Sequence, residues 1–186
     1  MGFNIFIINL LFKPYKMAKQ MLSEEFRRMQ KLAGIITETQ YTKLVENEEA
    51  EAINAAEKAK DTIVNNDKLE QKVDSLTPDQ IADLEKTLAN LGVTADSSIK
   101  DVANKIAPKI EKIVNESEES TQEKVADALS SLGGGLMASH FVPLIPIAIG
   151  NMIDSVAGGF AVTILTAGAL IGLAQLLKEK NKKPNP

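Results

Sequence analysis

Between residues 23 and 132, hydrophobic positions recur every three or four residues, which is the spacing of one face of an α-helix. The clearest stripe consists of Ile81, Leu84, Leu88 and Leu91. Polar residues, many of them Glu and Lys, fill the positions between the apolar ones. The pattern predicts an all-α fold, with amphipathic helices in the stretches 23–33, 38–63, 78–91, 98–113 and 121–132.

Capping residues mark where several of these helices begin. Thr77 precedes Pro78, a residue favoured at the first helical position, and Gln80 completes a capping box. The segment Thr37–Gln40 has the same box pattern, and Gly34 lies where a left-handed helix end is expected. These signals predict helices beginning near residues 38 and 78.

Other boundaries are predicted from single residues. Ser23 can cap the first helix and Ser98 a later one, whereas Gly92 is expected to end the helix that starts at Pro78. The long second helix is expected to break near residues 65–66. Pro108 lies inside the helical stretch that follows Ser98, so we expect a kink or a split there.

The pattern changes after residue 132. Gly133–Gly135 predicts a flexible joint, because successive glycines favour neither a helix nor a packed core. Residues 136–177 follow with Asp154 as their one charged residue, which suits a turn between two helices. Residues 155–177, at about 1.5 Å per residue, could cross a hydrocarbon layer of about 30 Å. This stretch is predicted to be a hydrophobic, Gly-rich helical hairpin or a transmembrane segment.

Two groups of residues are the candidate sites of this hydrophobic segment. Gly168 and Gly172 have the spacing that lets two helices approach closely, so they are candidates for helix–helix packing. The basic tail, residues 178–186, holds four candidates for a membrane interface on the cytoplasmic side: Lys178, Lys180, Lys182 and Lys183. The alternative is a soluble protein that buries the hairpin under its own helices or in an oligomer.

The first twenty residues stand apart from the acidic helical region, residues 21–132. The apolar run at residues 3–12 is too short to span a bilayer and is not preceded by a positive residue. We interpret residues 1–20 as a leader produced by upstream translation, with Met17 or Met21 as the true start. A membrane anchor is the alternative.

Composition gives little material for catalysis. The chain has no cysteine and a single histidine, His140, which we expect to be hydrogen-bonded or interfacial rather than a ligand. No phosphate-binding loop, dinucleotide motif or metal-ligand cluster is found, so no enzyme activity, metal, cofactor or small-molecule substrate is expected. Residues 38–127 carry a large excess of acid within a net charge of −4, which argues against binding nucleic acid.

Residues 24–41, EEFRRMQKLAGIITETQY, resemble a short motif of uncharacterised and virion-associated proteins of large tailed marine bacteriophages. The resemblance covers about a tenth of the chain. It implies a phage origin and an assembly role, in the virion or a host membrane, with no catalytic residues. We therefore expect a non-enzymatic structural or membrane-associated protein that self-associates or binds other virion proteins. The alternatives are a holin-like lysis protein and a soluble self-associating assembly protein.

Overall fold

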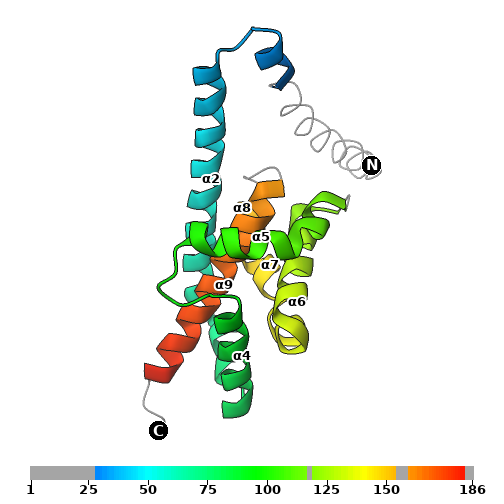
Figure 1. The fold of residues 1–186 in the computed structure, drawn as a ribbon. Helices are drawn as coiled ribbons and strands as arrows, with labels where there is room; N and C mark the ends of the chain where they lie inside the picture. The colour runs from blue at the N-terminus through cyan, green and yellow to red at the C-terminus, as the bar shows by residue number, and fades with distance from the viewer. Residues whose placement is uncertain (1–27, 117–118, 154–158, 183–186) are drawn as a thin grey trace, which may run out of the picture. The chain divides into compact units, whose positions relative to one another are not determined.

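The computed structural model describes residues 28–116, 119–153 and 159–182. The part of the chain that it describes contains helices and no strand, which confirms the predicted all-α class (Figure 1). The elements are α2 (Glu38–Val64), α3 (Asp67–Asp74), α4 (Pro78–Asn90), α5 (Ile99–Glu116), α6 (Thr121–His140), α7 (Ile145–Ala148), α8 (Gly150–Ile153) and α9 (Gly159–Lys182). The Ser23 cap and the leader lie outside the described residues.

The chain divides into two compact units, Met1–Glu49 and Ala50–Pro186, and the helix α2 belongs to both. In the first unit, residues 28–32 are helical and are followed by a turn in which Gly34 has φ +70°. This left-handed conformation confirms the helix end predicted at Gly34, since glycine adopts it without steric cost.

The predicted capping boxes are confirmed atom by atom. The Gln80 backbone N–H donates to Thr77 Oγ1 at 3.3 Å, and the Thr77 N–H donates to Gln80 Oε1 at 3.0 Å. Thr37 and Gln40 make the corresponding bonds at 3.3 and 2.9 Å. Asn66 caps α3 with its side chain, so the long helix does break where its sequence indicated. These caps satisfy backbone donors that a helix start leaves unpaired.

Interruptions were predicted inside two helices. Of the kink or split predicted at Pro108, the split does not occur, because α5 runs from Ile99 to Glu116 as one helix. The predicted glycine joint lies within α6, where Gly134 alone leaves helical geometry, with φ 64° and ψ −162°. A kink at one glycine thus joins two helical segments.

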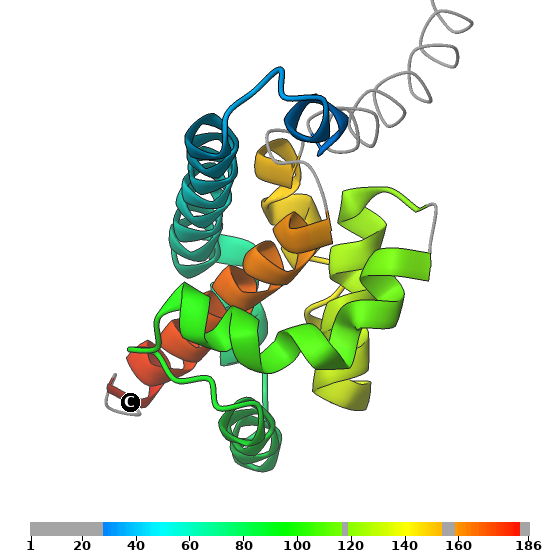
Figure 2. The same cartoon turned by 45° about the horizontal axis from the view of Figure 1, so that its top comes forward.

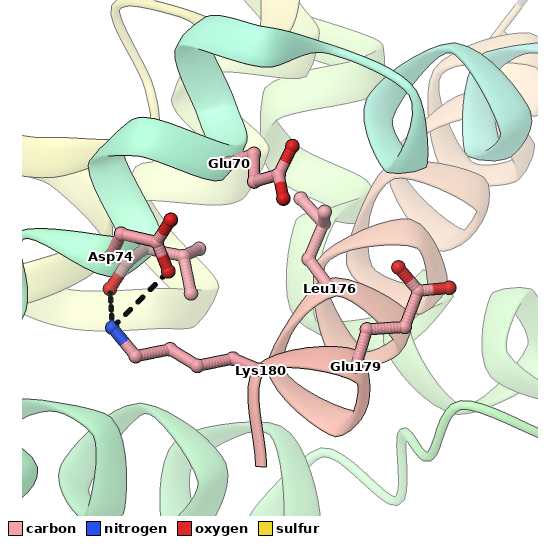
Figure 3. A pocket seen from close by; sticks show the side chains of 6 residues that line it. Glu70, Asp74, Leu176, Glu179 and Lys180 are labelled. Atoms are coloured by element: carbon pink, nitrogen blue, oxygen red, sulfur yellow. Dashed lines mark hydrogen bonds and ion pairs between the residues drawn. The ribbon is translucent and has the colours of Figure 1, made fainter. Parts of the chain in front are cut away.

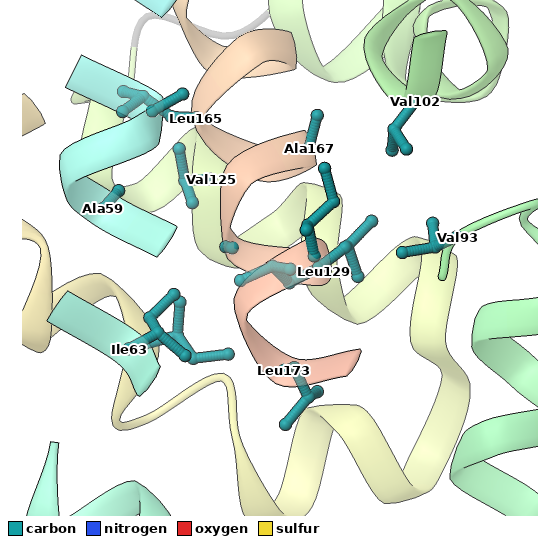
Figure 4. Packing of buried hydrophobic residues seen from close by; sticks show 14 of the residues in the cluster. Ala59, Ile63, Val93, Val102, Val125, Leu129, Leu165, Ala167 and Leu173 are labelled. Carbon is teal, nitrogen blue, oxygen red and sulfur yellow. The ribbon is translucent and has the colours of Figure 1, made fainter. Parts of the chain in front are cut away.

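The core of the second unit forms around α9 (Figures 1 and 2). Helices α3, α4, α5 and α6 contact α9, and the second part of α2 packs on it through Ala56 and Ile63. Figure 4 shows Ile63 of α2, Leu129 of α6 and Leu165 of α9 among the side chains of this core, and all three are fully buried. Amphipathic helices thereby enclose a helix that is apolar on every side. A helix of this kind is stable either in a protein core, as here, or in a membrane.

Candidate functional site

The apolar helix α9 is the most distinctive element of the second unit. Every residue from Ala161 to Ala174 is buried. The segment Phe160–Lys182 is long and apolar enough to cross a membrane, with a mean hydropathy of 2.0 over its most apolar window. Yet 89% of that window is buried inside the protein. Length and composition fit a bilayer, whereas the surroundings of the helix are those of a protein core.

The predicted packing glycines both face α2 of the same chain. A Cβ on Gly168 would lie 2.5 Å from the Ala56 carbonyl oxygen and 3.0 Å from the Ala56 Cβ. A Cβ on Gly172 would lie 3.0 Å from both the Lys60 carbonyl oxygen and the Ile63 Cβ. The two glycines therefore permit the close approach of α9 and α2, as small residues do between packed helices. Pairing of two copies through this motif stays a prediction.

Two of the four predicted membrane-interface lysines contact other residues of the second unit. Lys178 Nζ lies 2.7 Å from Asp96 Oδ2, and Lys180 Nζ donates to the Val73 carbonyl oxygen at 2.7 Å. The hydrogen bond and the positive charge of Lys178 lower the pKa of the Asp96 carboxyl. Lys182 is exposed, and Lys183 lies outside the described residues.

A shallow indentation lies beside Lys180 (Figure 3). Its lining comes from α3 and α9 and includes Glu70, Asp74 and Glu179, with Lys180 Nζ 3.6 Å from Asp74 Oδ1. The opening has room for little more than a water molecule. Of its charged residues, Asp74 and Glu179 are exposed, whereas Glu70 and Lys180 are half-buried. Among the described residues, no group of three or more His, Asp or Glu side chains is placed to hold a metal ion.

Two buried polar atoms have no hydrogen-bond partner within the described part of the chain: Thr166 Oγ1 on α9 and Nδ1 of His140 at the end of α6. Thr166 is fully buried among apolar neighbours. A hydroxyl in such a place normally bonds a carbonyl oxygen of its own helix one turn back. The expected role of Asp154 as a turn residue falls outside the described residues.

A second candidate site lies in the first unit, at Leu44 and Val45 of the predicted helical stretch 38–63. Both belong to the apolar positions of this stretch, yet their side chains are 39% and 43% exposed. Three more large apolar side chains of this unit are exposed: Met29, Leu32 and Ile35.

Comparison with known proteins adds no relative: no family model, no curated protein and no solved structure matches this chain.

Proposed function

We propose that this chain is a non-enzymatic structural protein that acts through helix packing and self-association. The observation that carries the proposal is the enclosure of α9, whose apolar surface is covered by helices of the same chain. A helix that is already covered in this way does not need a bilayer to remove its surface from water. The apolar residues left exposed are concentrated in residues 28–49, which are therefore the better candidates for contact with a partner.

The setting that we propose for this role is a phage virion. It rests on the likeness of residues 24–41 to a motif of virion-associated phage proteins. Assembly proteins bind through extended complementary surfaces and need no catalytic cleft, which agrees with the small size of the indentation between α3 and α9. Other virion proteins and further copies of this chain are the partners expected in this setting.

A holin-like or other membrane protein is the second candidate, and one observation favours it. Residues 160–182 pass the length and hydropathy requirements of a membrane span, and lysines lie at the end of this helix. In that case α9 would exchange its contacts with α2, α5 and α6 for lipid. The two functions differ in where α9 is found in a cell, which can be measured.

The test is fractionation of bacteria that express the full chain, with a single-span integral membrane protein of the host as the control. We expect the chain in the soluble fraction, and in sedimentation a species larger than one chain. Retention in membranes washed with alkaline carbonate, together with growth arrest on expression, would replace the structural role by the membrane role. A soluble chain that stays monomeric at every concentration would remove the support for self-association.

A further inference from the structure

The kink of α6 depends on glycine at position 134. Gly134 has φ 64° and ψ −162° and is the one residue inside α6 that leaves helical geometry. Glycine adopts this combination of angles at little cost, whereas it is strongly disfavoured for a residue that carries a Cβ. A glycine at this position therefore permits two forms of α6, the observed kinked form and a straight helix.

The kink also determines what Gly133 contacts. A Cβ on Gly133 would lie 2.2 Å from the Met137 Cβ, closer than two such atoms approach in proteins. In a straight helix, the Cβ atoms of residues four apart are separated by about 5–6 Å. Met137 is fully buried, so it cannot turn away while α6 stays kinked. A side chain at position 133 is thus compatible with the straight form of α6 and not with the kinked one.

The kink divides the second unit into two sections. The leading section, residues 50–133, contains the second part of α2, then α3, α4, α5 and the first part of α6. The terminal section, residues 135–182, contains the rest of α6, α7, α8 and the enclosed helix α9, which packs on the leading section. At the C-terminal end of α9, Asn181 Nδ2 donates to Glu85 Oε1 at 2.6 Å. The two sections thus share an extended interface that is apolar along α9 and polar at its end.

This interface does not require both sections to come from one chain. Because α9 is apolar on every side, opening of the kink leaves it in water unless other helices cover it. The helices with the matching surface are those of the leading section of another copy, provided that its own terminal section has also left. Every contact between the two sections is then formed again between the two copies.

We infer that two copies of the chain associate by exchanging their terminal sections, with Gly134 as the hinge. The inference rests on the proposed function, which includes self-association, and it specifies the interface. In the exchanged dimer, α6 of each copy is straight and α9 of each copy packs on the leading section of the other. Exchange of an identical element is a low-cost route to a dimer, because no new interface has to be built. The exposed apolar side chains of residues 28–49 are not needed for it.

The first experiment measures the dissociation constant of the dimer by sedimentation, after refolding from urea over a range of chain concentrations. Gly134→Ala should lower this constant by about tenfold or more, because alanine disfavours the kink in both monomers and suits the straight helix. Gly133→Ala should lower it as well, since the added Cβ meets Met137 only in the kinked form. Gly135→Ala is the matched control: nothing lies within 4 Å of its added Cβ and its φ is not positive, so no change is expected. Equal effects of the three variants, or a monomeric Gly134→Ala chain, would overturn the inference.

The second experiment keeps the native glycines, so its result does not depend on whether a glycine variant folds. The chain has no cysteine, and Glu85 and Asn181 are exposed residues on the two sides of the interface whose side chains are in contact. In a Glu85→Cys/Asn181→Cys chain at low concentration, a short bis-maleimide crosslinker joins the two positions within one monomer. The locked chain cannot exchange its terminal section. It should stay monomeric at concentrations at which the same chain without the crosslinker dimerises.

The outcomes separate this inference from the proposed function. If the locked chain dimerises as well as the unlocked one, another surface mediates association; the inference fails and the structural role stands. A native chain that is monomeric at every concentration overturns both. Recovery of the native chain in carbonate-washed membranes also overturns both, because α9 is then covered by lipid.

Discussion

At the scale of single residues, Gly168 is the more closely packed of the two α9 glycines that face α2. We expect Gly168→Ala to destabilise the unit by about 1–3 kcal/mol, because the new methyl group would lie 2.5 Å from the Ala56 carbonyl oxygen and force α9 and α2 apart. Thermal or urea unfolding of the purified chain measures the change. Gly135→Ala is the control: nothing lies within 4 Å of the added carbon, so we expect no loss of stability. A harmless Gly168→Ala would contradict the packing of α9 on α2.

Thr166 offers a second test inside α9. Its hydroxyl is fully buried and has no partner among the described residues, and an unsatisfied buried polar group costs about 1–3 kcal/mol. Valine has nearly the same shape and no hydroxyl, so Thr166→Val is expected to raise the free energy of unfolding. Thr163, with its side chain on the same helix, allows the same substitution for comparison. A destabilised Thr166→Val chain would mean that the hydroxyl has a partner after all.

Asp127 predicts a pH effect with a definite sign. Asp127 is an exposed residue, but partial desolvation raises the pKa of its carboxyl, and the charge and hydrogen bond of Glu119 raise it further, so the effect on stability is expected to be small. A raised pKa means that the folded state favours the neutral form, so this stabilising contribution is present at low pH and is lost as the pH rises through the raised value. We expect Asp127→Asn to be more stable than the native chain at neutral pH, with the difference vanishing below the usual aspartate pKa of about 3.9. Melting temperatures across this range measure it.

Asp96 predicts a pH effect of the opposite sign, because its pKa is lowered rather than raised. Its pKa is lowered by Lys178, so its contribution to stability is present above the usual aspartate pKa and is lost as the pH falls through the lowered value. Asp96→Asn should therefore be the less stable chain at neutral pH, by a small amount because the pair is exposed to solvent. If both variants shifted in the same direction, the assigned causes would be wrong.

At the scale of helices, Pro108 is the clearest departure from local preference. It lies inside α5 with its ring exposed, and it cannot donate the backbone hydrogen bond of a helix interior. We expect Pro108→Ala to stabilise the chain by up to about 3 kcal/mol, since alanine restores the donor and suits a helix. Unfolding in urea measures the gain. Loss of stability instead would show that the proline fixes a bend on which the packing of α5 depends.

Helix ends were predictable from sequence because caps are local. The pairs Thr77–Gln80 and Thr37–Gln40 satisfy backbone groups within one turn, so their chemistry is contained in four consecutive residues. The continuous helix through Pro108 was not predictable in this way. There, the apolar face formed by residues such as Val102, Ile106 and Ile110 is fully buried, and that packing overrides the local cost of the proline.

The candidate sites were predicted less completely than the helices, for the same reason. The close-packing role of Gly168 and Gly172 could be inferred from their spacing, but their partner is α2, which is about a hundred residues away along the chain. The exposure of Leu44 and Val45 depends on which helices reach them, and helical periodicity contains no such information. Contacts between distant segments are thus what sequence periodicity leaves undetermined.

At the scale of the whole molecule, the two units should differ in local stability although α2 runs through both. We expect backbone amides of residues 41–48 to exchange with deuterium much faster than those of residues 52–63, because only the latter are covered by packed helices. Mass spectrometry after a short labelling pulse measures this contrast within one helix. Equal protection along α2 in dilute monomer would contradict the division into units.

The position of α9 in the chain has a consequence for synthesis. The helices that surround it are made first, yet their apolar faces have no common core until residues 159–177 have left the ribosome. Domains generally fold as units, so the second unit cannot complete its folding while it is still being translated through α6. The nascent chain therefore exposes several apolar helix faces at once, and it should bind chaperones during translation and release them when α9 emerges.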